Sequence, residues 1–279
     1  MSTTRNTGAN SLLSGLPASG LRNVLRSCQQ VELKRAQVLA QPNERIRYVH
    51  FPVDGFVSMV AVLKDGGHLR VGMIGDEGMI GASIILGVDT FSDHAVVQRE
   101  GMALRMPVDA FRRQCAHSRA LRETINRYLH VTMAQLAQLA ACTGYHMVEA
   151  RLARWLLTSR DRAHSDEFYV THELLAYMLG VRRVGVTQAA AALQARGLIA
   201  YRRGHITIVD GLGLEQASCG CYERQNEIYE TTMSAQTKRL KRLAIRGLNS
   251  RSIPNRASGA SVSTASGASC SSARETSRM

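Results

Sequence analysis

The residues with the clearest capacity for recognition chemistry follow Gly180 in one short run. Arg182, Arg183, Thr187 and Gln188 share one face of a helix if the apolar residues between them turn inward. An arginine offers a planar pair of donors that matches O6 and N7 of guanine, and a glutamine can pair with adenine. A threonine hydroxyl at this spacing can reach a phosphate. The run therefore predicts a surface that reads base edges in the major groove of DNA.

Two short helices are predicted to hold this run in place. The first begins at His172, where the hydroxyl of Thr171 can accept a hydrogen bond from an unpaired amide. Gly180 supplies a tight turn without Cβ strain, and a second helix follows from Arg182 to about Arg196. Helical spacing assigns these residues to the buried faces: Leu174, Leu175, Leu179, Val186, Ala190 and Leu193. The pattern is typical of a helix-turn-helix.

A β-hairpin is predicted directly after these helices. Gly197 ends the second helix, and Leu198–Tyr201 and Ile206–Val209 alternate as two strands around Arg202 and Arg203. Arginines on such a wing suit the sugar-phosphate edge, so they would position the protein rather than select a sequence. The predicted contacts to the DNA backbone are Thr171, Thr187, Arg202 and Arg203. An ordinary helical hairpin with solvated arginines is the alternative interpretation.

The distribution of charge favours a polyanionic partner. The chain has 279 residues and a formal net charge of +13. Residues 12–115 carry twelve Lys/Arg against ten Asp/Glu, whereas residues 171–279 carry fifteen against seven. A basic segment behind a nearly neutral domain suits nucleic acid, although basic surface also serves solubility.

Residues 31–107 and the segment after them predict a β domain followed by a long helix. Short alternating stretches separated by turn signals run through residues 31–107, which indicates a small antiparallel barrel or sandwich. From His117 to about Cys142 there is no Gly or Pro, and apolar residues recur every three or four positions. Thr143-Gly144 is expected to break this helix, and a second helix is expected from Met147 to Thr158.

The long helix carries two apolar stripes. The second stripe, which consists of Met133, Ala137 and Ala140, widens the apolar face. One of the two stripes can pack on the β domain, and the other then needs another cover. A partner helix from a second subunit is one answer, and a wide core within a monomer is the other. The predicted dimer contacts are Leu121, Ile125, Leu129, Thr132, Leu136 and Leu139.

The segments Leu179–Thr187 and Leu198–Ile206 resemble the Crp/Fnr superfamily of bacterial transcription regulators, as does the layout of residues 12–215. The resemblance implies an α+β fold with an N-terminal antiparallel β-roll (double-stranded β-helix), a long dimerisation helix and a C-terminal winged helix-turn-helix. The expected domains are a cyclic-nucleotide-binding-like sensor at 12–115, the dimerisation helix at 116–142, the winged helix at 143–215, a helical extension at 216–246 and a disordered Ser/Ala/Gly/Arg tail at 247–279.

The resemblance also assigns base-reading roles. Arg183 matches the arginine that reads guanine, Arg182 precedes it at the helix start, and Gln188 occupies a second base-facing position. Val184 stands where the family often has an acidic reader. We therefore expect a different half-site, with Val184 against a thymine methyl group.

The β-roll departs from the family's cyclic-nucleotide pattern at two positions. Ala82 follows Ile80-Gly81 where a ribose-binding glutamate is expected, and Asp93 lies in the region of the phosphate-binding arginine. A carboxylate opposite a phosphate is repulsive. Cyclic AMP is therefore disfavoured, and the effector is unknown.

The cysteines give no metal pattern in the sequence. Of six, only Cys219-Gly220-Cys221 are closely spaced, and no second pair completes a four-ligand zinc motif. We interpret this pair as structural, with a thiol sensor as the alternative. No catalytic arrangement is apparent, so we expect no enzyme, no cofactor and no metal.

Together these features predict a sequence-specific transcription regulator that binds a two-fold DNA operator as a homodimer. An unknown signal at the β-roll would modulate it, and RNA polymerase is a further expected partner. No apolar run is long enough to span a membrane, so a cytoplasmic location is expected. The alternative is a sensor module that acts through protein partners and binds nucleic acid only non-specifically.

Overall fold

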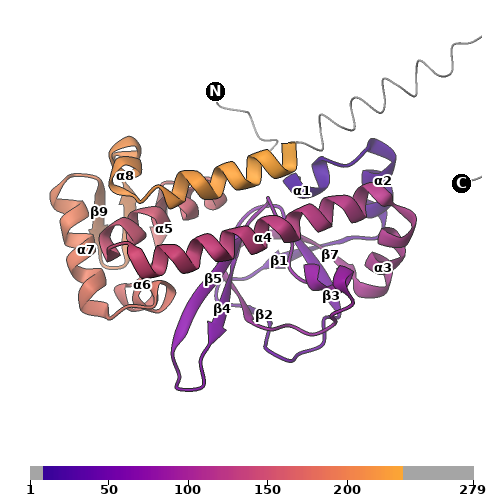
Figure 1. Cartoon of the computed structure of the whole chain (residues 1–279), viewed down its shortest axis with the longest axis horizontal. Coiled ribbons are helices and arrows are strands. Elements are labelled where there is room, and N and C mark those ends of the chain that lie inside the picture. Colours follow the sequence, from indigo (N-terminus) through magenta and orange to yellow (C-terminus); the bar gives the residue numbers. More distant parts are fainter. Residues whose placement is uncertain (1–8, 235–279) are drawn as a thin grey trace, which may run out of the picture. The chain divides into compact units, whose positions relative to one another are not determined.

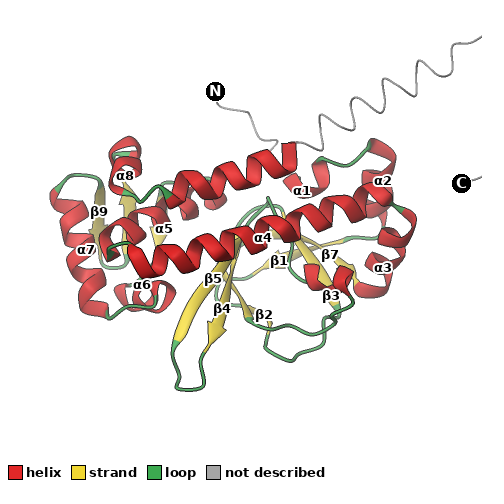
Figure 2. Ribbon diagram, viewed as in Figure 1, coloured by secondary structure: helices red, strands yellow, loops and turns green. Residues whose placement is uncertain are grey.

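The computed structural model describes residues 9–234 and has the predicted α+β class (Figures 1 and 2). Two short helices, α1 (Ser11–Ser14) and α2 (Ala18–Arg26), come first. Seven strands follow: β1 (Gln29–Leu33), β2 (Val38–Ala40), β3 (Tyr48–Pro52), β4 (Phe56–Val62), β5 (His68–Ile74), β6 (His94–Arg99) and β7 (Gly101–Pro107). A 3₁₀ helix, η1 (Ala82–Leu86), separates β5 from β6, and α3 (Val108–His117) follows β7.

The seven strands form two antiparallel sheets that share a core. Their orders are β1-β7-β3 and β2-β6-β4-β5. Leu33 and Ala103 of the first sheet pack in the same buried cluster as Val57 and Val97 of the second. Period-2 alternation predicted β1 to β5, and the predicted antiparallel β-roll is confirmed.

The long helix α4 (Arg119–Tyr145) extends past the expected break. Ser118 caps its start by accepting a hydrogen bond from the amide of Leu121. Thr143 donates its hydroxyl to the carbonyl of Leu139, and a single glycine costs a helix only about 1 kcal/mol relative to alanine. The expected break at Thr143-Gly144 is therefore wrong. The next helix, α5 (Val148–Ala163), is also longer than predicted.

The assignment of the two stripes of α4 needs a correction. Leu121 and Ile125 are fully buried in the chain's own core, so the prediction that they contact a second subunit is wrong. The longer side chains of the wide apolar face pack inward, where they remove the most surface from water. The stripe left outside contains Met133, which is 68% exposed, with exposed Ala137 and Ala140.

The winged helix is built from β8 (Glu167–Tyr169), α6 (His172–Leu179), α7 (Arg183–Ala195), β9 (Ile199–Arg202) and β10 (His205–Ile208). Its sheet has the antiparallel order β8-β10-β9. Leu152 and Leu156 of α5 share its core with Leu175, Val186 and Leu193, so α5 is part of this unit.

Two helices follow the wing: α8 (Gly211–Ala217) and a helix over residues 221–234, called here the C-terminal helix. The Tyr222 hydroxyl donates to Asp161 of α5, and the Tyr229 hydroxyl donates to the carbonyl of Glu77 in the β-roll. Gln135 of α4 donates to the carbonyl of Gln225. The predicted extension thus includes this helix, while residues 235–246 and the predicted tail lie outside the described residues.

Within residues 9–234, none of the helices combines the length and apolar composition that a membrane span needs.

Candidate DNA-binding surface and sensor cavity

The first turns of α7 present the run that was predicted to read bases. Val186 and Ala190 are buried against the winged-helix core. The opposite face carries the predicted readers as exposed side chains: Arg182, Arg183, Val184 and Gln188. Val184 is 61% exposed, which leaves its methyl groups free for an apolar contact. This arrangement can hydrogen-bond base edges and contact a methyl group at the same time.

Local chemistry fixes how α6 leads into α7. The amide of Leu174 donates to Oγ1 of Thr171 at 3.1 Å, as predicted for the cap of α6. Gly180 has a φ of +63°, and a Cβ there would lie 2.9 Å from Cδ1 of Leu69 in β5. The positive φ favours glycine at this turn, and a larger residue would also require the flexible Leu69 side chain to shift.

Thr187 already has hydrogen-bond partners in the free protein. Its hydroxyl donates to the carbonyl of Arg183 at 3.1 Å, and Nδ1 of His172 lies 3.0 Å from its Oγ1. The His172 ring stacks on Tyr201 of the wing at 4.4 Å. Burial lowers the pKa of His172, and Arg183 lowers it further, so both favour the neutral ring. A phosphate oxygen can only accept, and Thr187 must therefore redirect its hydroxyl to make the predicted backbone contact.

The wing places its arginines at the tip of a two-residue turn. Arg202 pairs with His205, and the turn residues Arg203 and Gly204 have φ values of +51° and +85°. This left-handed pair matches the twist of a tight hairpin. Arg202 and Arg203 are both exposed, as a contact with the DNA backbone requires.

A cavity of about 230 Å³ lies between the β-roll, α4, α5 and the C-terminal helix. Ala82 and Asp93, the two positions that depart from the cyclic-nucleotide pattern, both line it. Burial raises the pKa of the Asp93 carboxyl group. Four of the predicted dimer residues also line this cavity: Leu129, Thr132, Leu136 and Leu139.

Three arginines that sequence reasoning did not single out converge on this cavity: Arg70 of β5 with Arg154 and Arg162 of α5. Arg162 pairs with Glu77 at 2.7 Å. Arg70 is 4% exposed, and within residues 9–234 its Nε and that of Arg154 have no hydrogen-bond partner. Burial lowers the pKa of Arg70, and the positive charges of Arg154 and Arg162 lower it further. Uncompensated buried cations attract an anion.

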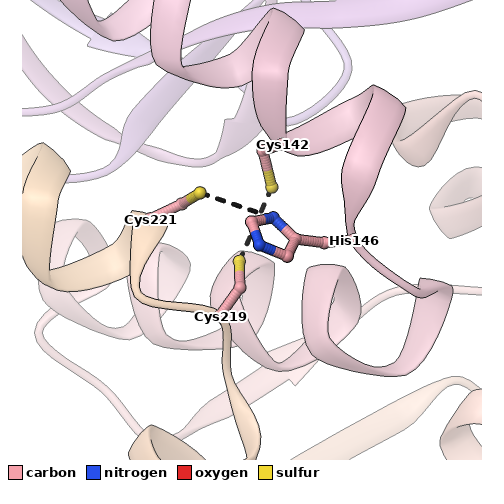
Figure 3. A group of neighbouring side chains, drawn as sticks. All are labelled: Cys142, His146, Cys219 and Cys221. Carbon is pink, nitrogen blue, oxygen red and sulfur yellow. Dashed lines mark hydrogen bonds between the residues drawn. The ribbon is translucent and has the colours of Figure 1, made fainter.

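Four side chains of metal-ligand type meet near the end of α4, and we call them the Cys/His cluster: Cys142, His146, Cys219 and Cys221. Figure 3 shows them pointing toward one another from the α4 terminus and from the segment between α8 and the C-terminal helix. Sequence reasoning found Cys219 and Cys221 but missed the other two. The sequence did contain one signal for them: Cys142 and His146 are four positions apart, and residues at that spacing share one face of a helix.

The cluster lies in an electropositive environment. Hydrogen bonding from the Cys219 thiol lowers the pKa of Cys142 well below its ordinary value, and the charge of Arg154 lowers it further. Cys142 is fully buried, and Cys219 and Cys221 are nearly so, whereas His146 is exposed. The exposed histidine gives solvent access to the cluster.

Two protein-family models match the chain. The cyclic nucleotide-binding domain matches residues 30–118, and the Crp-like helix-turn-helix domain matches residues 150–217. Together with the winged helix described above, they define a transcription regulator with a helix-turn-helix DNA-binding domain and a domain of the cyclic nucleotide-binding type. No curated protein matches the chain.

Many solved structures share this fold. A transcriptional regulator of the Crp/Fnr family from Eubacterium rectale is 19% identical, with a TM-score of 0.60, and the match covers 74% of this chain and 97% of that one. FixK2 from Bradyrhizobium japonicum is 13% identical, with a TM-score of 0.60 and coverages of 69% and 98%. The c-di-GMP responsive regulator CLP from Xanthomonas campestris is 16% identical, with a TM-score of 0.58 and coverages of 69% and 99%. The chain belongs to the Crp/Fnr family of transcription regulators.

Proposed function

We propose that this regulator binds a two-fold operator as a homodimer and reads it with the first turns of α7. The observation that carries the proposal is the exposed row of Arg182, Arg183 and Gln188 on a helix whose other face is buried. Neither arginine takes part in an ion pair within residues 9–234. Their guanidinium groups are therefore available to guanine, while Arg202 and Arg203 hold the backbone.

The partner in the dimer is a second copy of α4. The stripe of Met133, Ala137 and Ala140 is apolar and exposed along the helix. Covering it with the same stripe of another copy removes apolar surface from water, and the small alanines let two helices approach closely. A two-fold pair then presents two copies of α7 to half-sites about one DNA turn, roughly 34–36 Å, apart.

The signal at the sensor is an anionic small molecule. Arg70 belongs to the β-roll, and Arg154 and Arg162 belong to the first helix of the winged unit. An anion between them would tie the two units together, and it would shift the protein toward the conformation that holds it best. Ala82 and Asp93 argue against the family's usual mode of holding cyclic AMP.

The proposal also includes the predicted division of the chain into a β-roll domain at 12–115, a dimerisation helix at 116–142 and a winged helix-turn-helix domain at 143–215. It further includes a cytoplasmic location and contact with RNA polymerase. They are consistent with a transcription regulator but rest on the family alone.

The experiment is fluorescence anisotropy with DNA from upstream of the regulator's own gene, titrated against scrambled competitor across a range of salt. A specificity ratio of about 10³ or more supports the proposal. Equal affinity for all fragments, in the presence and absence of cell-extract small molecules, would instead favour a sensor that acts through protein partners.

A further inference from the structure

We propose that the Cys/His cluster is a binding site for one Zn²⁺ ion. The ligand atoms of its four residues all lie within 4.8 Å of one another. Three thiol sulfurs and one imidazole nitrogen form one of the standard ligand sets of structural zinc.

The distances within the cluster match the edges of a zinc tetrahedron. Zn–S bonds of about 2.3 Å and Zn–N bonds of about 2.0–2.1 Å give S–S edges of about 3.8 Å and S–N edges of about 3.6 Å. Sγ of Cys142 lies 3.6 Å from Sγ of Cys219, and Sγ of Cys221 lies 3.5 Å from Nδ1 of His146. A single ion at the centre therefore requires little movement of the ligands.

Two other uses of these residues fit less well. A disulfide joins only two sulfurs, at about 2.05 Å, and would leave the third thiol and His146 without a role. An iron–sulfur cluster inserts sulfide between its irons and so separates the cysteine sulfurs further than one tetrahedral ion does. The compact arrangement of three thiols and one imidazole favours a single ion.

The surroundings support an ionised ligand set. Nε2 of Gln138 donates to Sγ of Cys221 at 3.0 Å, and such a hydrogen bond orients the sulfur of a metal thiolate. Three thiolates and one neutral imidazole around Zn²⁺ carry a net charge of −1. The buried guanidinium groups of Arg151 and Arg154 belong to α5, whose Ala150 packs against the three cysteines. On binding, the thiols release their protons to solvent.

The site would fasten two distant parts of the chain. Cys142 and His146 lie at the end of α4, immediately before α5 begins the winged unit. Cys219 and Cys221 lie at the start of the C-terminal helix, whose Gln225 and Tyr229 line the sensor cavity. Zinc would therefore hold the C-terminal helix over the cavity and fix the junction between α4 and α5.

The test is elemental analysis of the full-length protein, purified under reducing conditions, together with replacement of the metal by Co²⁺. We expect about one zinc per chain. The cobalt form should show the ligand-field absorption of a tetrahedral ion and a thiolate-to-cobalt charge-transfer band. Iron with acid-labile sulfide, or a Cys142–Cys219 disulfide in metal-free protein, would overturn the proposal.

Variants locate the ion. Cys142→Ser, Cys219→Ser and Cys221→Ser should each lose most of the zinc, whereas Cys28→Ser, outside the cluster, should keep it. His146→Cys preserves a four-ligand set and should retain zinc, while His146→Ala should lower the affinity. Zinc that persists in all three Cys→Ser variants would place the ion elsewhere and refute the site.

A measurement on the wild type avoids the possibility that a variant fails to fold. Removal of the metal with a strong chelator should increase hydrogen exchange in residues 211–234, and added Zn²⁺ should reverse the increase. If the chelator leaves hydrogen exchange unchanged in zinc-loaded protein, zinc does not hold the C-terminal helix in place.

The variant Gln138→Ala keeps all four ligands but removes the hydrogen bond to Cys221, and it should weaken zinc binding by about 10–100-fold.

Discussion

Arg183→Ala tests base readout with a magnitude that follows from the structure. Arg183 is the first residue of α7, is exposed and belongs to no ion pair within residues 9–234, so its truncation should leave folding unchanged. A bidentate contact with guanine contributes about 1–3 kcal/mol of discrimination, and a dimer makes it twice. The specific affinity should therefore fall by about 30-fold to about 10⁴-fold.

The assay for this variant is anisotropy with the operator and with scrambled DNA at several salt concentrations. Specific binding should weaken by the stated factor, while non-specific binding changes little. Arg203→Ala on the wing is the matched control, because it removes the same charge but should weaken both kinds of DNA alike and reduce the salt slope by about 1 per chain. If the two variants lower specific and non-specific affinity by the same factor, Arg183 does not read a base and the reasoning is refuted.

Three further predictions concern the dimer, the cavity and pH. Met133→Asp places like charges across the two-fold axis and should give monomers in light scattering. Leu63→Asp, at an exposed apolar residue in the turn between β4 and β5, should leave the dimer intact, and dimers in both variants would contradict the proposed interface. Arg70→Met removes a buried guanidinium group whose Nε has no hydrogen-bond partner within residues 9–234, and it should raise the free energy of unfolding by about 1–3 kcal/mol in denaturant melts. It should also abolish stabilisation by phosphate at constant ionic strength, and a loss of stability would refute this account of the cavity. Burial and Arg105 lower the pKa of His50 from 6.5 to about 4, so the unfolded chain takes up the proton first. Stability should fall by up to about 3 kcal/mol as the pH drops from 6.5 to 4, and the drop should be smaller in His50→Asn.

Local patterns in the sequence predicted most of the fold. The cap at Thr171, the turn at Gly180 and the wing around Arg203 depend on residues close in sequence, and each is observed. Short-range hydrogen bonds and backbone preferences decide such features, so the local sequence predicts them before any tertiary contact is known.

Features that depend on tertiary packing were harder to predict. Periodicity located both stripes of α4, but only the packed β-roll shows that Leu121 and Ile125 face inward and Met133 faces outward. The Cys/His cluster joins two pairs, Cys142 with His146 and Cys219 with Cys221, that are at least 73 positions apart, and no spacing rule connects one pair with the other. The cavity arginines come from β5 and α5, and each alone has the sequence signature of a surface residue.

The most direct test of the central claim is selection of bound duplexes from random DNA by the full-length protein, followed by sequencing. The account predicts an inverted repeat whose half-site centres lie about 10–10.5 base pairs apart, or a multiple of that spacing, with a guanine in each half that Arg183→Ala no longer selects. Recovery of single half-sites, direct repeats or no enriched sequence would contradict a two-fold dimer that reads DNA through α7.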